Sequence, residues 1–221
     1  DVITDESIKW LENRDKSKPF FLMSHHKAPH GLWEYAKRHE NLFQEIDIPL
    51  PNSLYENKEH GPLKGKKYGS SISDRNPKRS MLNQVSSKNW PTGAIDTFGL
   101  TKKEKIYAAY QKYLKDYLRT AASIDENVGR LLDYLDKNNL SDNTMVIYTS
   151  AQGQFLGEHD YFDKRWMYEE SLSMPLLIRY PKKIKPEQVN NDIILNIDFA
   201  PTFLELAKQT VPLEMQGKSF L

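Results

Sequence analysis

The chain has 221 residues, which is enough for one domain with a substantial core. Hydrophobic residues make up 38% and charged residues 28%, a composition that excludes a disordered or membrane-embedded chain. The net charge of +1 argues against a nucleic-acid-binding surface, and no apolar run approaches the roughly 20 residues that a membrane-spanning helix requires. Because the chain has no cysteine, disulfides and thiolate metal sites are excluded.

The first part of the chain predicts two short helices, a core strand and a long irregular segment. A cap at residues 4–7 followed by apolar positions predicts a helix that ends near Arg14. The apolar run 20–23 predicts a short core strand, and the helical spacing over 33–43 predicts a surface helix. Residues 46–98 are rich in proline and glycine and follow no sustained period.

The segment 46–98 has two interpretations. Loops of this length inside a compact domain are uncommon and often functional. One interpretation is a loop that shapes a substrate site and offers cationic side chains, such as the lysines in 64–67, to an anionic glycan. The other is a mobile insertion whose lysines are simply solvated, and the sequence does not decide between the two.

The second part predicts one long helix, three strands and a final helix. Thr101 and Glu104 stand in the register of a capping box, and apolar residues recur every three or four positions to about residue 138, with a kink or break expected over 120–125. The aromatic residues of this stripe are expected in the core. The strands and the final helix are expected at 145–149, 174–180, 193–197 and 198–207, with Asp198 as the helix cap.

Three histidines follow the predicted strand 20–23. His25, His26 and His30 lie close together in the sequence, and imidazole is the commonest nitrogen ligand of metal ions in proteins. Histidines at a strand end also bond to nearby carbonyl groups. The cluster alone therefore indicates either a metal site or ordinary structural histidines.

A dense group of polar residues follows the predicted strand 145–149. Open α/β sheets place their sites just past the carboxyl ends of core strands, which favours a site in the loop 150–164. By composition alone, the more ordinary interpretation of such a loop is a hydrated connection whose two glycines serve its turns. Gly217-Lys218-Ser219 is not interpreted as a phosphate loop, because the upstream glycine and the strand-to-helix turn of that motif are missing.

The order of residues in this loop, T-S-A-Q-G-Q-F-L-G-E-H-D-Y-F-D-K, resembles a motif of the type I sulfatases, members of the alkaline-phosphatase-like superfamily. The positions that match the family pattern are Thr149, Ser150, Gln152, Gly153, Leu156, Gly157, Glu158, His159 and Lys164. Further family-like segments are Lys27-x-Pro29-His30, Asp125-x-x-Val128-Gly129 and Asp198-x-Ala200-Pro201-Thr202. One position departs, because Ala151 stands where the family has a calcium-binding aspartate.

The resemblance implies an α/β fold with a mixed, largely parallel sheet sandwiched between helices. The family's Cys/Ser-x-Pro-Ser-Arg motif and Asp-Asp pair are absent, so residues 1–221 are expected to form the later part of one catalytic domain, incomplete at the amino-terminal side, with 46–98 as a long irregular insertion or substrate loop. By resemblance the protein is periplasmic or secreted. No signal peptide is recognisable at Asp1, which leaves open a leader removed upstream.

The resemblance also assigns catalytic and substrate-binding roles. In the family, the hydrated aldehyde of a formylglycine attacks sulfur while fixed cations stabilise the charge on the sulfate oxygens. Lys164 is expected to bind the sulfate, and His30 is expected to assist the departing oxygen. Lys27, His26 and His159 are expected to contribute to the substrate pocket.

Calcium is the metal that the resemblance implies. Calcium requires several oxygen ligands, mainly carboxylates, and the amide oxygen of Gln152 is expected to be one of them. The methyl group of Ala151 neither coordinates calcium nor balances its charge, so we expect weak metal binding and an inactive copy. The sequence does not show whether Ala151 is an engineered or a natural change.

The resemblance therefore predicts part of a sulfuric ester hydrolase that removes sulfate from a sulfated carbohydrate with calcium and formylglycine. One alternative is a homologue that binds sulfated glycan without cleaving it, which Ala151 favours. Another is a phosphate-ester hydrolase of the same superfamily, which would require several metal-binding histidines. The particular sugar, the position of its sulfate and the oligomeric state do not follow from the sequence.

Overall fold

The computed structural model of the protein describes residues 1–55 and 69–221, so the lysines at 64–67 lie outside the described residues. In chain order the elements are α1 (Val2–Asn13), η1 (Lys37–His39), β1 (Ser70–Ser71), η2 (Pro77–Arg79), α2 (Met81–Val85), α3 (Lys102–Lys137), η3 (Ser141–Asn143), β2 (Val146–Thr149), β3 (Phe155–Leu156), η4 (Glu158–Asp160), β4 (Tyr161–Asp163), α4 (Glu169–Leu172), β5 (Leu176–Arg179), η5 (Asn196–Asp198) and α5 (Phe199–Leu206). The η elements are short 3₁₀ helices.

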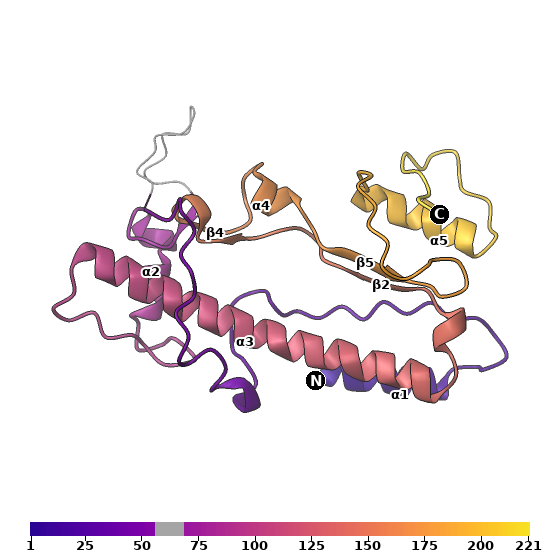
Figure 1. Ribbon diagram of the computed structural model, residues 1–221, viewed down its shortest axis with the longest axis horizontal. Coiled ribbons are helices and arrows are strands. Elements are labelled where there is room, and N and C mark those ends of the chain that lie inside the picture. The colour runs from indigo at the N-terminus through magenta and orange to yellow at the C-terminus, as the bar shows by residue number, and fades with distance from the viewer. Residues whose placement is uncertain (56–68) are drawn as a thin grey trace.

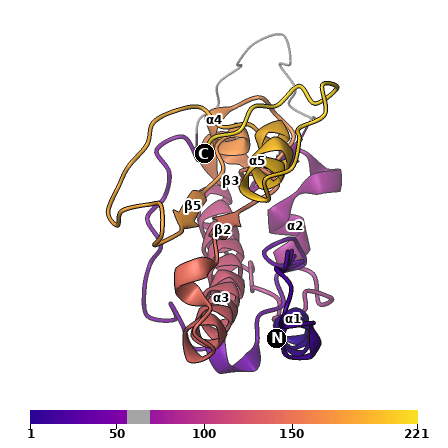
Figure 2. The same cartoon turned by 90° about the vertical axis from the view of Figure 1, so that its right-hand side faces the viewer.

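The helix α3 runs along most of the length of the molecule (Figure 1). α1 packs against its carboxyl-terminal half, and α2 packs against its amino-terminal half. β2 and β5 run along another side of α3, and α5 lies on the far side of these strands (Figure 2). The expected α/β class is confirmed by this combination of helices and strands.

The two ends of α3 agree with the sequence pattern. The backbone N–H of Glu104 donates to the Thr101 hydroxyl (3.3 Å), and the backbone N–H of Thr101 donates to the Glu104 carboxylate (2.7 Å), so the predicted capping box is confirmed. The helix continues without interruption to Lys137, and the kink or break expected over 120–125 is wrong. That stretch contains neither proline nor glycine, the usual causes of a kink.

The aromatic stripe of α3 lies at the centre of the core, as predicted. The ring of Tyr113 is fully buried, and its centroid lies 4.8 Å from that of Trp33 and 5.8 Å from that of Phe162. The Trp33 ring also packs near Trp90, at 6.2 Å. Because aromatic pairs bury large apolar areas in defined geometries, segments far apart in the sequence converge on this helix.

Residues 69–98 are mostly irregular, as expected, but they belong to the core. Their fully or largely buried side chains include Ile72, Met81, Val85 and Trp90. These side chains pack in the same cluster as the aromatic stripe of α3. This part of the segment 46–98 is therefore a packed element and not a peripheral excursion.

Asp116 is a fully buried carboxylate on α3. It accepts hydrogen bonds from Trp90 Nε1 (2.9 Å) and Thr92 Oγ1 (2.5 Å). It also forms ion pairs with Lys112 (3.2 Å) and Arg119 (3.3 Å). Because a buried charge is costly unless it is paired and hydrogen-bonded, this group ties the segment around residue 90 firmly to α3.

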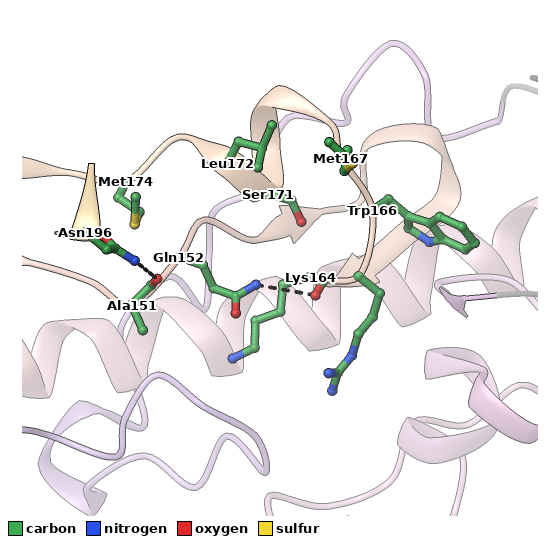
Figure 3. Close-up of a pocket in the computed structure, with 10 residues that line it drawn as sticks. Ala151, Gln152, Lys164, Trp166, Met167, Ser171, Leu172, Met174 and Asn196 are labelled. Carbon is green, nitrogen blue, oxygen red and sulfur yellow. Dashed lines mark hydrogen bonds between the residues drawn. The ribbon is translucent and has the colours of Figure 1, made fainter. Parts of the chain in front are cut away.

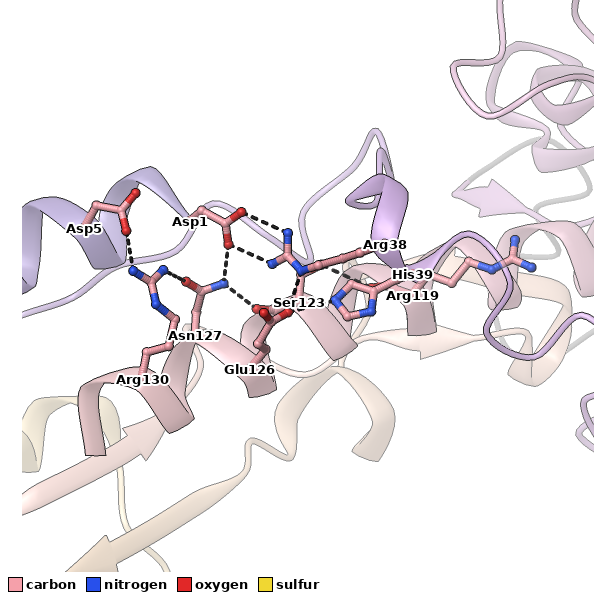
Figure 4. Close-up of polar contacts among 9 residues, drawn as sticks. All are labelled: Asp1, Asp5, Arg38, His39, Arg119, Ser123, Glu126, Asn127 and Arg130. Carbon is pink, nitrogen blue, oxygen red and sulfur yellow. Dashed lines mark hydrogen bonds and ion pairs between the residues drawn. The ribbon is translucent and has the colours of Figure 1, made fainter. Parts of the chain in front are cut away.

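Charged side chains align α1 with α3 at their surface (Figure 4). Arg38 pairs with Asp1 (2.8 Å) and with Glu126 (2.7 Å), and Arg130 pairs with Asp5. These side chains are half-exposed, so solvent screens each pair and its contribution to stability is small. Their role is to set the orientation of α1 and η1 on the long helix.

The named strand pairs in the described residues are antiparallel, whereas the expected sheet is largely parallel. β2 pairs with β5, and β4 pairs with both β1 and β3. The predicted strands 145–149 and 174–180 are confirmed as β2 and β5. However, β2 is only partly buried, and Tyr148 on it is 40% exposed. No helix in the described ranges is long and apolar enough to span a bilayer.

Three predicted elements are wrong. Residues 20–23 are extended, but they are not hydrogen-bonded to any described strand, and a strand requires such a neighbour. Within 33–43 only η1 is helical, because Trp33 inserts into the core and the carbonyl of Leu42 accepts a hydrogen bond from Arg119 (2.8 Å). Residues 193–197 are mostly exposed, pair with no described strand and end in η5.

Asp198 is the N-cap residue of α5, as expected, but its side chain makes no capping hydrogen bond to that helix. Its carboxylate instead accepts the backbone N–H groups of Leu195 (2.8 Å) and Lys218 (2.8 Å). These two hydrogen bonds lower the pKa of Asp198 and join the end of the chain to η5.

Asp116→Asn should lower the free energy of unfolding by about 3–5 kcal/mol, because Lys112 and Arg119 would remain buried without a counter-charge. Urea denaturation followed by tryptophan fluorescence measures this change. Asp133→Asn is the matched control on the same helix, because the Asp133 side chain is 69% exposed. We expect it to cost less than about 1 kcal/mol, and equal losses for the two variants would contradict the role of Asp116.

Candidate functional site

An open cavity of about 470 Å³ lies where β2 ends and the loop 150–164 begins (Figure 3). Its walls come from this loop, from the stretch through α4, and from the turn before α5. The lining residues are Ala151, Gln152, Lys164, Arg165, Trp166, Met167, Ser171, Leu172, Met174 and Asn196. The cavity therefore occupies the place where the sequence predicted a site, at the end of the strand 145–149.

Gly153 brings the loop into close contact with α4. Its backbone N–H donates to the carbonyl of Ser171 (3.0 Å). A Cβ at this position would lie 2.2 Å from the carbonyl oxygen of Glu170 and 2.5 Å from that of Ser173, so only glycine permits this approach. The contact fixes the floor of the cavity to the short helix that forms part of its wall.

The second half of the loop makes a tight turn before Lys164. Gly157 has φ +113° and lies against the ring of Tyr110, which a Cβ would meet at 2.6 Å. His159 and Asp160 are both left-handed, with φ +54° and +63°. β4 then pairs with β1 and β3, so the backbone that leads into Lys164 is held on both edges.

Asp160 anchors this turn to the loop that follows residue 69. Its carboxylate accepts the backbone N–H (2.7 Å) and the hydroxyl (2.6 Å) of Ser73 and pairs with Arg75 Nε (3.0 Å). Burial raises the pKa of Asp160, and the bonds from Ser73 and Arg75 oppose this rise. Arg75 also lies over the ring of Tyr161, 4.5 Å from its centroid, so the anchor reaches the first residue of β4.

Three of the residues singled out from the sequence line the cavity together: Ala151, Gln152 and Lys164. Figure 3 shows the Lys164 side chain extending beside the side-chain amide of Gln152. The Gln152 amide nitrogen lies 3.4 Å from the carbonyl oxygen of Lys164, and Asn196 donates to the carbonyl of Ala151 (3.3 Å). An ammonium group beside a neutral amide in an open cavity suits an anionic, oxygen-rich group.

His159 is a predicted site residue that does not line this cavity. Its ring centroid lies 5.2 Å from that of Tyr168, and its Nε2 lies 4.0 Å from the Glu170 carboxylate. Its backbone N–H donates to the hydroxyl of Ser53 (2.9 Å). These contacts hold the turn behind the cavity, and a direct role of His159 in substrate binding stays a prediction.

His26, Lys27 and His30 also lie outside the lining of this cavity. His30 is exposed, and its Nδ1 lies 3.1 Å from the carbonyl of Gly31. Burial lowers the pKa of His26. Over residues 1–55 and 69–221, no group of three or more His, Asp or Glu side chains could hold a metal ion, so a metal site at these histidines is not supported. Their catalytic and pocket roles stay predictions.

Several lining residues had no role assigned from the sequence. Trp166, Met167, Leu172 and Met174 supply apolar surface, and Arg165 adds a second cation whose Nε pairs with Asp163 (3.0 Å). Arg165, Trp166 and Met167 follow Lys164 directly in the sequence, and this adjacency is the signal that could have found them. Asn196 lies 45 residues from Ala151, so no local pattern predicts its presence.

The described lining does not fit a calcium ion. Calcium takes about six to eight oxygen ligands, mainly carboxylates. The described walls of the cavity include the amide of Gln152 but neither aspartate nor glutamate, and Ala151 offers only a methyl group. The weak metal binding expected from Ala151 stays a prediction for the whole protein.

Comparison with known proteins finds relatives of this chain. A family model described as N-sulphoglucosamine sulphohydrolase, C-terminal, matches residues 157–221. The N-acetylglucosamine-6-O-sulfatase of Bacteroides thetaiotaomicron is 42% identical over 99% of this chain and 44% of its own length. A solved structure, in complex with its substrate D-glucosamine-2-N,6-O-disulfate, is 38% identical with a TM-score of 0.86, over 99% of this chain and 50% of that chain.

A phosphonate monoester hydrolase from Silicibacter pomeroyi, 22% identical over 87% of this chain and 34% of that chain, has a TM-score of 0.61 and shares the fold alone. The fold is thus one that the sulfatase relative and this hydrolase share. Within it, this chain belongs to the sulfatases, as a later part of their catalytic domain. It spans about half the length of the solved relative and less than half that of the Bacteroides sulfatase.

Gly153→Ala should destabilise the site, because the new Cβ would overlap the backbone carbonyls of Glu170 and Ser173. We expect the free energy of unfolding to fall by about 1–3 kcal/mol, measured by urea denaturation. Gly129→Ala is the control: nothing lies within 4 Å of a Cβ at this position of α3. Helix propensity predicts a gain of about 0.5–1 kcal/mol there. A similar gain at Gly153 would contradict the close approach.

Proposed function

We propose that the protein containing this chain is built to hydrolyse sulfate esters of sulfated glucosamine, with the 6-O-sulfate as the group removed. The observation that carries the proposal is the cavity at the end of β2, in which Lys164 extends beside Gln152. The choice of sugar is supported by the Bacteroides relative, named for 6-O-desulfation of N-acetylglucosamine, and by the glucosamine disulfate bound to the solved relative.

Lys164 is proposed to hold the sulfate. A sulfate ester is a poor electrophile until fixed cations and hydrogen-bond donors neutralise its oxygens, and a lysine ammonium in a partly buried cavity provides such a charge. The paired strand β4 ends immediately before Lys164, which sets the position of its backbone. Trp166 and Met167 provide an apolar wall suited to the carbon face of a sugar ring.

The nucleophile and the metal ligands are proposed to come from other parts of the protein. A formylglycine nucleophile has no precursor motif in these 221 residues, and calcium requires carboxylates that the described lining lacks. His30 is proposed to protonate the departing sugar oxygen, which requires it to approach the sulfate held at Lys164. With Ala151 in place of a carboxylate, we propose that this copy is inactive.

A second candidate function is binding of sulfated glycan without hydrolysis. Ala151 favours it, because the cavity keeps its cation while the position expected to hold a metal ligand carries a methyl group. The alternative of a phosphate-ester hydrolase has less support, since the described histidines form no metal site. We also propose, from the family resemblance, that the protein is periplasmic or secreted.

Lys164→Met should weaken the binding of glucosamine 6-O-sulfate to the chain by on the order of tenfold or more, because the charge-assisted hydrogen bonds to the sulfate are lost. Isothermal titration calorimetry measures this change. Lys137→Met, at the exposed end of α3, is the matched control and should leave the affinity unchanged. Equal binding by both variants would contradict the assignment of Lys164.

Ala151→Asp in the full-length protein should restore calcium-dependent release of sulfate, because the new carboxylate would stand beside Gln152 at the end of β2. Ion chromatography of released sulfate, with and without a chelator, measures it. Mass spectrometry of the formylglycine serves as the control. Continued inactivity with intact formylglycine, or the absence of a Cys/Ser-x-Pro-Ser-Arg motif upstream of Asp1, would count against a sulfatase.

A further inference from the structure

Trp166 forms part of the cavity wall (Figure 3), and its indole ring is held there by packing. Its buried N–H has no hydrogen-bond partner among the described residues, so hydrogen bonding does not fix the orientation of the ring. The ring lies against that of Tyr161, the first residue of β4, with centroids 5.9 Å apart and planes at 36°. A ring pair at this distance is attractive. The position of Tyr161 therefore influences where the Trp166 ring lies.

The same two rings pack against the backbone just before β1. A Cβ at Gly69 would lie 2.7 Å from Nε1 of Trp166 and 3.0 Å from Cε1 of Tyr161. A larger residue at this position would displace one ring or the other. The segment that begins at Gly69 therefore forms a second layer behind this wall of the cavity.

Arg75, in this second layer, packs on the Tyr161 ring. Its guanidinium carbon lies 4.5 Å from the ring centroid, and its side chain is only 22% exposed. A cation over an aromatic face at this distance is attracted to the ring, and more strongly where water is partly excluded. Guanidinium, phenol and indole groups thus form one continuous series, from Arg75 through Tyr161 to Trp166, which ends in the cavity wall.

Asp160 fixes the orientation of the Arg75 guanidinium. Nε of Arg75 donates to the Asp160 carboxylate (3.0 Å), which also accepts the N–H (2.7 Å) and the hydroxyl (2.6 Å) of Ser73. Because a guanidinium is planar, it donates to a carboxylate in its own plane while its face lies on a ring. A lysine ammonium would supply the charge without the plane. Arginine is therefore the side chain that suits both Asp160 and Tyr161.

We propose that Arg75 is a positioning residue of the cavity, which orients Trp166 through Tyr161 for contact with the sugar ring. Arg75 does not line the cavity, so its effect on a ligand passes through these two rings. The inference rests on the proposed function, in which Trp166 faces the sugar and Lys164 holds the sulfate. Loss of Arg75 should therefore weaken the binding of a sulfated sugar and leave the binding of inorganic sulfate unchanged.

Fluorine NMR of the full-length protein, labelled with 5-fluorotryptophan, tests the packing. Trp166→Phe identifies the Trp166 signal by its loss. In Arg75→Met and in Arg75→Lys this signal should shift while the other tryptophan signals stay in place, because neither new side chain presents a planar cation to Tyr161. Arg79→Met, at an exposed arginine of the same segment, is the control and should shift no signal. An unmoved Trp166 signal in either Arg75 variant would overturn the proposal, as would a shift of every tryptophan signal.

Isothermal titration calorimetry of the same proteins tests the effect on binding, with glucosamine 6-O-sulfate and inorganic sulfate as the two ligands. Arg75→Met should weaken sugar binding by roughly three- to tenfold, the size of a coupling between neighbouring residues, and should leave inorganic sulfate binding unchanged. In a Trp166→Ala background, Arg75→Met should have no further effect on sugar binding. Additive losses in this double variant, or equal losses for the two ligands, would overturn the proposal.

Lys164→Met separates failure of this inference from failure of the proposed function. It should weaken the binding of both ligands, because both present sulfate oxygens to Lys164. If it does so while Arg75→Met changes neither affinity, the inference fails and the proposed function stands. If Lys164→Met changes neither affinity, the proposed function fails, and the Trp166 signal decides by itself whether Arg75 positions this wall.

Discussion

The buried carboxylate of Asp116 imposes the constraint on which the rest of this structure depends. An unpaired charge in a protein interior is so costly that its four partners, two on α3 and two near residue 90, must stay in place together. This arrangement closes the core around Tyr113. The Tyr113 hydroxyl donates to the carbonyl of Phe155 (3.2 Å) and accepts from the Gln154 amide (3.1 Å), so the same core supports the loop that forms the cavity.

The parts of the fold that could be predicted from the sequence are those with local causes. The capping box of Thr101 and Glu104 and the aromatic stripe of α3 are complete within one helix, and both are confirmed. The helix expected over 33–43 fails for a distant cause. Its apolar spacing serves to insert Trp33 among rings from three other segments, and this contact outweighs a modest helix preference.

The candidate site likewise contains residues that a local pattern predicts and residues that only the fold brings there. Gln152 and Lys164 belong to one motif and meet in one cavity, as a contiguous pattern could predict. Asn196 reaches the cavity through the turn before α5, and the anchor of Asp160 comes from Ser73 in a segment that looked irregular. Such residues are selected by the fold, since nothing in their immediate sequence distinguishes them from other polar positions.

The conformation of the loop at Ala151 does not depend on the side chain at that position. The two contacts on either side of Gln152 use backbone groups of the loop: the carbonyl of Ala151 accepts from Asn196, and the N–H of Gly153 donates to Ser171. The methyl group of Ala151 is exposed. The side chain at this position can thus change with almost no folding penalty, so quality control in the cell would not remove a copy altered only there. A protein of this fold can therefore change the chemistry of the cavity at this position in one step and still persist as a stable, folded chain.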